Sequence, residues 1–460
     1  MLSRLIAPFL ARRAIHYGWV VAAITFLTML VTAGAVGAPG VLLLPLQREF
    51  GWETSQISSA LAIRLLLFGL MGPFAAALIN RFGVRTMTLC SLALVSCGLA
   101  LSLAMTEVWQ LILLWGVVVG LGTGMTALVL GATIATRWFT RRRGLVIGLL
   151  TASSATGQLV FMPLLSLISE HLGWRVALTT LCLLLCAVAL AVLALMRDRP
   201  ADLGLAPYGE SAATPAPAAL PANSVAFAAL DALRQASRTR IFWVLFGTFF
   251  VCGASTNGLL QPFLIPFCVD IGVPEVRAAG LLALIGVFDF IGTVASGWLS
   301  DRYDNRWLLF WYYALRGLSL LYLPLADVSF YGLALFAMFY GLDWVATVPP
   351  TVRLTAERFG RERANLVFGW VFAGHQLGAA AAAFGAGWSR SELLSYVPAF
   401  LVSGSLCILA AFLILSVRKA VKPALSPAEY PRRNGTFRHF FFALLRAPGS
   451  LTSGTSSQAE

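Results

Sequence analysis

The sequence predicts an all-α membrane protein, with twelve transmembrane helices arranged as two six-helix bundles related by pseudo-two-fold symmetry. Three observations predict this fold. The 460-residue chain is 59% hydrophobic and only 12% charged, whereas a soluble domain has about 25% charged residues. Twelve apolar runs are long enough to cross a bilayer as helices. The second half of the chain also repeats part of the first at a constant spacing.

The apolar runs are separated by short polar connections and by one long linker. The predicted spans are 17–42, 55–79, 86–105, 109–135, 144–169, 174–196, 241–266, 275–299, 307–326, 329–352, 364–388 and 394–417. The first apolar run is longer than the core of a cleaved signal peptide, so we expect a retained first helix. Seven cysteines lie in or beside the spans without metal-ligand spacing, so we expect neither disulfides nor a metal site.

The net charge of +13 is distributed by topology rather than clustered as in a nucleic-acid-binding surface. If the N-terminus is cytoplasmic, 27 of the 33 Lys and Arg residues fall in cytoplasmic segments, four fall outside and two lie within spans. This bias is the one that the positive-inside rule describes. We therefore expect a multi-pass membrane protein with both termini cytoplasmic and no nucleic-acid partner.

The internal repeat aligns residues 44–85 with residues 265–306 at an offset of 221, without a gap. An even number of spans in each repeat gives both halves the same orientation. The aligned pairs include Leu44 and Ile265, Pro45 and Pro266, Glu49 and Asp270, Gly51 and Gly272, Leu78 and Leu299, Arg81 and Arg302, and Arg85 and Arg306.

These spans and repeats divide the chain into four parts. They are a first bundle over 1–196, a cytoplasmic linker over 197–240, a second bundle over 241–417 and a cytoplasmic tail over 418–460. The linker is rich in Pro, Ala and Ser and cannot bury a core, although an amphipathic helix is expected within 224–238. The basic tail carries an aromatic patch over 437–442. That patch is either a segment on the anionic leaflet or disordered.

A loop motif occurs once in each half, as Ala76-Ala-Leu-Ile-Asn-Arg-Phe-Gly-Val-Arg85 and as Gly297-Trp-Leu-Ser-Asp-Arg-Tyr-Asp-Asn-Arg306. Both copies resemble the Gly-x-Leu-x-Asp-Arg-x-Gly-x-Arg loop of the major facilitator superfamily. The resemblance covers nearly all of residues 15–417, and it implies that the motif's charges pair with the opposite half and hold the cytoplasmic gate shut. The gating residues expected on this basis are Arg81, Gly83, Arg85, Gly297, Asp301, Arg302 and Arg306.

The two copies depart from the pattern in different ways. The first has Ala76 for Gly and Asn80 for Asp, which removes a charge from its latch. The second has Asp304 for Gly. The alternative for both loops is simple positive-inside anchoring. In the fourth span, Gly116, Gly120, Gly122 and Gly124 lie in an apolar run, where glycines favour close helix packing or helix bending rather than nucleotide binding.

Four ionisable residues within spans are the strongest pointers to function, because burying them in a membrane is costly. They are Arg64, Asp289, Asp343 and His375. The superfamily resemblance implies that all four lie on helices bordering a central cavity. Arg64 is expected to bind a carboxylate or another anion, or else to pair with a buried acid. Arg316 lies in a peripheral span and is expected to be structural.

The remaining candidates have two interpretations each. Asp289 or Asp343 either carries a coupled proton or neutralises one of the arginines. His375 either donates to the anion or is a packing histidine. Gln158 hydrogen-bonds either a substrate or a neighbouring helix. Asn257 and Gln261 are four residues apart on one helix face, beside a proline that frees backbone groups, and we expect them to contact a substrate.

Three segments, HYGWVVAAITF (16–26), PLQREFGW (45–52) and RWFTRRRG (137–144), are similar to bacterial relatives of monocarboxylate transporters and oxalate/formate antiporters. Those groups tend to carry a cationic residue in span eight, and the antiporters tend to use Lys in span eleven. Here the corresponding spans hold Asp289 and His375. The two differences fit a single cationic anchor, Arg64, with a protonatable partner.

We therefore predict a secondary active transporter of the bacterial inner membrane that works by alternating access. It is expected to be a monomeric symporter in membrane lipid, taking up a small organic anion such as a carboxylate together with protons. Proton-driven efflux of amphipathic compounds and uptake of a neutral vitamin-like solute are alternatives. A non-transporting sensor would need a signalling domain, for which the linker and tail are too short. We expect no enzyme and no cofactor, because neither a nucleophile–base pair nor an ATP-binding motif occurs.

Overall fold

The structure is a computed structural model that describes residues 8, 12–13, 15–52, 54–210, 225–325 and 330–417. Within those residues the chain is almost entirely helical, apart from an isolated parallel bridge between Phe139 and Tyr208. Twelve of its helical segments are long and apolar enough to cross a membrane. The predicted all-helical fold with twelve spans is confirmed. The tail from residue 418, with its aromatic patch, lies outside the described residues.

The first half supplies six spans, of which the fourth is broken into successive pieces. Gly83 and Gly173 adopt φ angles of 89° and 88°, a region open to glycine, and they join consecutive spans almost without a loop. The helices are α2 Gly18–Phe50, α3 Thr54–Phe82, α4 Val84–Ser102, α5 Val108–Leu111, the π-helix η1 Ile112–Val119, α6 Gly120–Met125, α7 Leu128–Trp138, α8 Arg143–Leu172 and α9 Trp174–Leu195.

The described part of the linker contains two short helices, and the second half again supplies six spans. The helix expected within 224–238 is present as α10. The bounds are η2 Pro200–Leu203, α10 Val225–Ala236, α11 Arg240–Ser255, the π-helix η3 Thr256–Leu260, α12 Gln261–Asp270, α13 Glu275–Ser300, α14 Asn305–Tyr322, η4 Leu323–Leu325, α15 Phe330–Asp343, α16 Val348–Phe359, α17 Ala364–Leu393 and α18 Val397–Leu415.

Span ten is not the continuous helix that its apolar run predicts. It breaks between α15, which ends at Asp343, and α16, which begins at Val348. Pro349 and Pro350 stand in the first turn of α16, where they lack the N–H groups that a continuous helix would need and restrict the residues before them. Span four breaks between Met125 and Leu128, which is nearly the same place in the first repeat.

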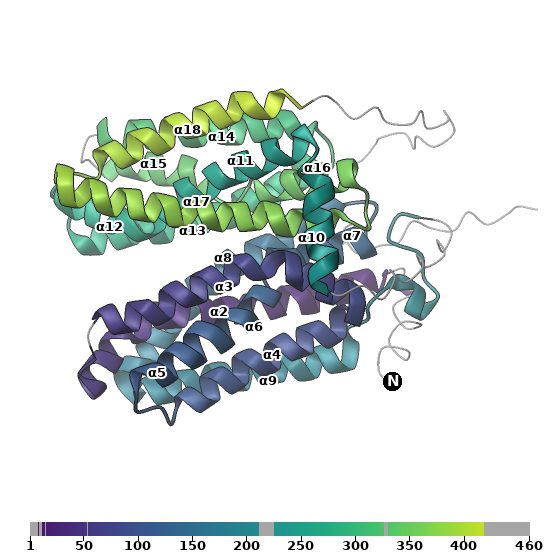
Figure 1. Ribbon diagram of the computed structural model, residues 1–460, viewed down its shortest axis with the longest axis horizontal. Helices are drawn as coiled ribbons and strands as arrows, with labels where there is room; N and C mark the ends of the chain where they lie inside the picture. Colours follow the sequence, from purple (N-terminus) through teal and green to yellow (C-terminus); the bar gives the residue numbers. More distant parts are fainter. Residues whose placement is uncertain are drawn as a thin grey trace, which may run out of the picture.

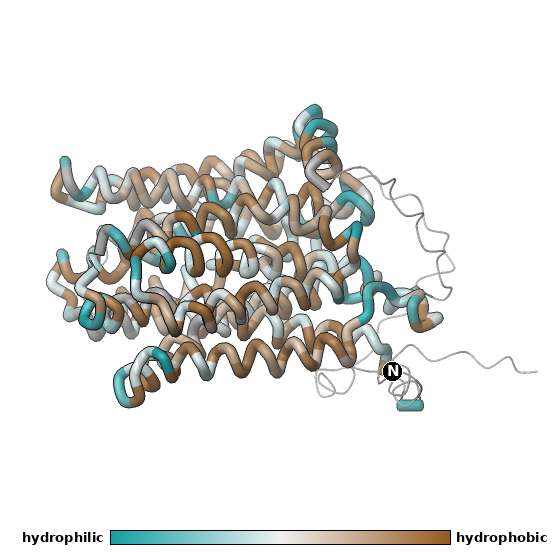
Figure 2. The backbone as a smooth tube through the Cα atoms, turned by 60° about the horizontal axis from the view of Figure 1, so that its bottom comes forward, coloured by the Kyte–Doolittle hydropathy of each residue, from teal (hydrophilic) through white to brown (hydrophobic). Residues whose placement is uncertain are grey.

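The two bundles lie side by side, and α10 crosses one end of both (Figure 1). We call this end the linker end; it also carries the connections that follow α3, α7, α13 and α16. The other is the opposite end. Hydrophobic residues dominate the middle of the helices, while hydrophilic residues gather at both ends (Figure 2). This distribution suits an apolar layer between two aqueous surfaces.

The halves meet along two seams, where α3 packs against α17 and α8 packs against α13. Glycines permit the close approach. A Cβ atom on Gly369 would lie 2.6 Å from the Cα of Pro73, and one on Gly148 would lie 2.6 Å from the carbonyl oxygen of Thr293. The offset of 221 continues beyond residues 44–85, because α4 and α14 begin 221 residues apart and α8 and α17 both begin and end 221 residues apart. Gly148 and Gly369 are therefore equivalent positions of the two halves, and the repeat relates the two seams in space.

Candidate functional site

Arg64 is a buried cation held by backbone carbonyl groups. Only 7% of the residue is exposed, and its Nη1 donates to the oxygens of Val36 at 2.7 Å and Ala35 at 3.4 Å on α2. Pro39 stands four residues after Ala35 and has no N–H to donate to that oxygen. None of the ion pairs found among the described residues involves Arg64. A buried guanidinium without a carboxylate partner is suited to binding an anion.

The contact between α3 and α17 shows how far along the helix axis Arg64 lies. A Cβ atom on Gly69 would lie 2.5 Å from the Cβ of Gln376. Arg64 is five residues before Gly69 on α3, so it lies about 7.5 Å closer to the opposite end than this contact, at 1.5 Å per helical residue. Arg64 therefore sits one to two turns beyond the tightly packed part of the α3–α17 seam.

Asn257 and Gln261 lie at a similar depth on span seven. Gly258 packs on α17, where an added Cβ would lie 2.3 Å from the carbonyl oxygen of Ala379, and this contact on α17 is about one turn beyond the level of Gln376. Both polar side chains are exposed, although they lie within a membrane span. Asn257 is in the π-helix η3, a distortion that recurs at functional sites.

His375 lies among aromatic rings of the second half, beside the α3–α17 seam. Its ring is stacked with that of Phe372 at 5.9 Å and lies 5.1 Å from that of Phe249. The Phe372 ring also contacts Phe68 on α3, at 5.8 Å. The His375 Nδ1 atom is buried without a hydrogen-bond partner among the described residues. His375 thus lies nearer the linker end than Arg64, with aromatic rings close to both.

Asp289 on α13 is buried and fixed at the break in span ten. Its Oδ1 accepts from the Thr293 hydroxyl at 2.9 Å and from the backbone N–H of Val345 at 3.0 Å. Val345 lies between α15 and α16, where the interrupted helix leaves its N–H available. Among the described ion pairs none includes Asp289.

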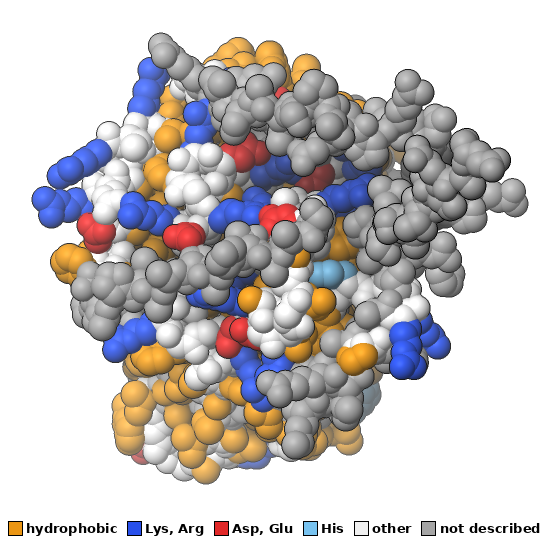
Figure 3. Space-filling view, turned by 90° about the vertical axis from the view of Figure 1, so that its right-hand side faces the viewer, with side chains coloured by type: hydrophobic (Ala, Val, Ile, Leu, Met, Phe, Trp, Pro, Cys, Tyr) orange, Lys and Arg blue, Asp and Glu red, His pale blue; other side chains and the backbone are white. Residues whose placement is uncertain are grey.

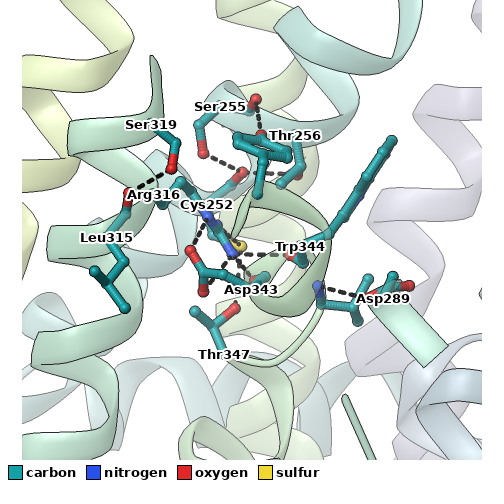
Figure 4. A network of polar contacts seen from close by, with 12 residues as sticks. Cys252, Ser255, Thr256, Asp289, Leu315, Arg316, Ser319, Asp343, Trp344 and Thr347 are labelled. Atoms are coloured by element: carbon teal, nitrogen blue, oxygen red, sulfur yellow. Dashed lines mark hydrogen bonds and ion pairs between the residues drawn. The ribbon is translucent and has the colours of Figure 1, made fainter. Parts of the chain in front are cut away.

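Asp343, by contrast, is paired with Arg316, and both side chains are buried (Figure 4). The Arg316 Nε donates to Asp343 Oδ2 at 3.1 Å, and Nη1 donates to the Cys252 sulfur at 3.0 Å. Its Nη2 donates to the backbone carbonyls of Asp343 and Trp344, which are left open where α15 ends. The equivalent positions of the first repeat hold Val95 and Gly122, so the network belongs to the second half alone.

The second loop motif joins the two halves through Asp301. Its carboxylate accepts from the backbone N–H groups of Gly144 at 2.8 Å and Leu145 at 3.0 Å, in the first turn of α8. It also pairs with Arg353 of α16. A carboxylate at a helix N-terminus is stabilised by the free amides and the helix dipole. The close approach needs Gly297, where a Cβ would lie 2.4 Å from the Gly144 carbonyl oxygen.

The first motif makes the corresponding contact without a charge. The amide groups of Asn80 and Asn365 bond each other, and Arg137 donates to the Asn80 oxygen at 2.7 Å. Asn365 lies in the first turn of α17 and is the repeat equivalent of Gly144. The Asn80 departure therefore keeps a contact between the halves, with a side-chain amide bonded to Asn365 in place of a carboxylate bonded to backbone N–H groups.

The described contacts of the other predicted gating residues lie within their own half or with the adjoining start of the linker. Arg85 and Gly83 lie against Asp198, and Arg306 binds Asp304 and the Val417 carbonyl. Arg81 and Arg302 lie over the rings of Phe82 and Trp298 respectively, at 5.2 and 3.8 Å. The side chain of Gln158 lies outside the described residues.

Sequence reasoning missed a third connection between the halves, made by the linker. We call residues 199–210 the linker strap. Its Tyr208 exchanges backbone hydrogen bonds with Trp138 and Thr140, and its Glu210 accepts from Thr140 at 2.6 Å and from Arg361 at 2.9 Å. Arg361 lies between α16 and α17 in the second half. The repeat offers a partial signal, because Thr140 and Arg361 occupy equivalent positions of the two halves.

Comparisons with known proteins agree with this architecture. The Major Facilitator Superfamily sequence family matches residues 22–342 and 275–452. Monocarboxylate transporter 12-B of Danio rerio is 26% identical over 422 residues, or 87% of each chain. Monocarboxylate transporter 11 of Homo sapiens is 28% identical over 453 residues, which cover 94% of this chain and 90% of that protein.

Solved structures share the fold at lower sequence identity. The E. coli fucose:proton symporter matches with a TM-score of 0.65 at 16% identity, over 86% of this chain and 98% of that chain. The human organic anion transporter MFSD10 matches with a TM-score of 0.65 at 16% identity, over 86% and 99%. With the family match spanning nearly the whole chain, the protein belongs to the Major Facilitator Superfamily and is a membrane transporter.

Proposed function

We propose that this transporter is a proton-coupled symporter that takes up a small organic anion, such as a carboxylate, by alternating access. The observation that carries the proposal is Arg64, a buried guanidinium within span two whose described partners are two carbonyl oxygens. An Arg–carboxylate pair is frequently bidentate and charge-assisted. The similarity to monocarboxylate transporters supports the same substrate class.

The proposed anion site lies between the halves, with Asn257 and Gln261 as polar contacts. Exposed amide side chains at membrane depth are costly unless they face water. His375 would lie on the linker side of the anion and supply a further donor. The alternatives, a neutral solute or an amphipathic compound moving outward, would not need an unpaired buried cation.

We assign the proton to Asp289 rather than Asp343. Asp343 is fixed by the Arg316 guanidinium, so its protonation would break a buried ion pair. Asp289 is held by a hydroxyl and a backbone N–H and can gain or lose a proton without that cost. Its bond to Val345 lies at the break in span ten, so protonation would act directly on a joint in a cavity-lining span.

The orientation we propose places the linker end in the cytoplasm of a cell with the transporter in its plasma (inner) membrane. The bias of Lys and Arg toward the linker-end segments supports it. The state described is then outward-facing. Near the linker end Gly297 and Gly369 are in tight contact across the two seams, and the bonds of Asp301 to α8 close the same end.

Uptake into proteoliposomes tests the anion site. A panel of radiolabelled carboxylates is offered with and without an inward proton gradient. Losing a charge-assisted bond removes about 1.5–3 kcal/mol, so Arg64→Gln should raise KM about tenfold or more. Arg175→Gln is the control, because it removes an exposed arginine whose ion pair with Glu49 contributes little. Wild-type KM in Arg64→Gln, or uptake of neutral solutes only, would contradict the proposal.

The proton assignment has a separate test. Asp289→Asn should abolish accumulation driven by the pH gradient while preserving exchange of labelled for unlabelled substrate, because exchange need not release the proton. Asp270→Asn, which removes an exposed acid paired with Arg390, should leave both activities intact. Gradient-driven accumulation that survives in Asp289→Asn would exclude this residue as the carrier.

A further inference from the structure

We infer that the second bundle binds the phosphate of an anionic phospholipid headgroup in a basic pocket at the linker end. The pocket lies away from the anion site proposed above, between the ends of spans seven, ten and twelve. It has a volume of about 290 Å³, and its lining residues are Arg240, Ile241, Val244, Arg358, Ser416 and Val417.

The pocket is positively charged and therefore favours an anionic ligand. Arg240 and Arg358 bring two guanidinium groups to it from α11 and from the last turn of α16, and no acidic residue is among the described lining residues. Guanidinium groups bind phosphate oxygens with parallel hydrogen bonds. Arg side chains are prominent across this end of the molecule (Figure 3), but here two of them line one pocket.

The backbone adds to the same preference. Arg240 and Ile241 are the first residues of α11, a helix of 16 residues. The N-cap Thr239 makes no side-chain capping bond, so the first N–H groups of α11 are not capped by it. A helix N-terminus attracts phosphate through its free N–H groups and its dipole.

Exposed tryptophans place the pocket at the level of lipid headgroups. Trp243, one turn along α11 from Arg240, is 55% exposed, and Trp307 and Trp311 of α14 are 51% and 56% exposed. Trp rings concentrate at the membrane–water interface. Ile241, Val244 and Val417 give the pocket an apolar wall, which fits the glycerol and first acyl carbons of a lipid better than a free phosphate ion.

The protein's own tail is a poorer occupant. The chain continues from Val417 with Arg418 and Lys419, and Lys422 follows. These residues repeat the charge of the pocket, and like charges repel. A basic pocket between membrane helices on the cytoplasmic side is a known type of headgroup site. The anionic leaflet beside it is therefore the source that we propose.

Native mass spectrometry of the full-length protein tests the site. The protein is purified in neutral detergent and titrated with phosphatidylglycerol or, for comparison, with phosphatidylcholine. We expect retained phosphatidylglycerol and a higher melting temperature only with the anionic lipid. The double variant Arg240→Gln, Arg358→Gln should bind it at least tenfold more weakly. The matched control Arg234→Gln, Arg238→Gln removes two exposed arginines near the pocket and should bind like wild type.

Two outcomes would overturn the inference. One is equal lipid retention in the pocket variant and the control variant. The other is stabilisation of the wild type by inorganic phosphate that matches that of the lipid and is lost in the pocket variant, which would make the ligand a free anion. If the glutamine variant fails to insert, Arg240→Lys with Arg358→Lys keeps both charges without the fork geometry. It should retain part of the lipid binding, and unchanged affinity would again contradict the inference.

Discussion

At the scale of single residues, the Arg316 guanidinium has two tasks that can be separated. It neutralises Asp343, and it donates to the carbonyls of Asp343 and Trp344 at the end of α15. Removing one member of a buried ion pair leaves an uncompensated charge and costs about 3–5 kcal/mol. Arg316→Met should therefore destabilise the protein by that amount, measured by unfolding in mixed detergent. Adding Asp343→Leu should restore only part of the loss, because both carbonyls still lack their donor.

A double-mutant cycle decides between these tasks. Full recovery in the double variant would show that charge pairing is all that Arg316 contributes, and unchanged stability in the single variant would contradict both tasks. Val95→Ala on α4 is a control at the equivalent position of the first repeat. It removes a buried side chain without disturbing a charge.

His16 gives a residue-scale prediction about pH. Its Nδ1 accepts from the Gly18 N–H at 3.1 Å, so Nε2 carries the proton and donates to the Ala206 carbonyl of the linker strap at 2.9 Å. Burial lowers the pKa of His16 from its ordinary 6.5. A lowered pKa stabilises the neutral form, so this contribution is complete above the unfolded pKa and is lost as pH falls through the folded pKa.

Hydrogen exchange of residues 204–210 checks the prediction. After correction for intrinsic rates, protection should be lower at about pH 5.5 than at about pH 7.5, a range across which only a histidine is expected to titrate. In His16→Asn this pH dependence should disappear. Equal protection at both pH values in the wild type would exclude His16 as the titrating group.

At the scale of helices, the Asp301 carboxylate connects the end of α13 to the start of α8 and to Arg353 of α16. Asp301→Asn removes the charge from three bonds, each contributing up to about 1.5–3 kcal/mol. The linker end should open more often, with labelling of an introduced Asn257→Cys from the linker side rising about tenfold or more. Asp304→Asn is the control, because its pair with Arg306 lies within one half and Asn caps α14 as well as Asp does.

Unchanged labelling of Asn257→Cys in the Asp301→Asn background, together with wild-type transport by the Asp301→Asn single variant, would exclude a gating role for Asp301. Equal increases in the two variants would point instead to general loosening of the α13–α14 loop.

The membrane-spanning helices were predictable from sequence, because a long apolar run is visible from the order of the residues alone. The breaks in spans four and ten and the π-helix η3 were not predicted, because they depend on packing between helices. Pro349 and Pro350 indicate the break in span ten, but the span was predicted from the length of its apolar run alone, which gave a continuous helix. The hydrogen-bond partners of Asp301 could not be predicted either, because two of these partners are backbone N–H groups, which every residue except proline carries.

At the scale of the whole molecule, the repeat at an offset of 221 predicted the relation between the bundles but not where they differ. Arg316 and Asp343 occupy the places of Val95 and Gly122, and the amide contact of Asn80 corresponds to the carboxylate contact of Asp301. Arg64 was recognisable as a costly buried charge, whereas its carbonyl partners on α2 required the structure. The two halves therefore differ in their polar contacts at positions where a charged or polar residue stands in only one copy of the repeat, or differs between the two copies.

The orientation of the whole molecule gives the last prediction. The described linker residues, both ends of the described chain and most of the described Arg residues lie at the linker end, and positively charged segments are retained in the cytoplasm. Alkaline phosphatase is active only after export, so fusions at residue 215 and after the C-terminus should both be inactive. A fusion after Met105, in the connection between α4 and α5 at the opposite end, should be active and serves as the control. Strong activity at residue 215 would contradict this orientation and place Asp301 on the outer side of the membrane.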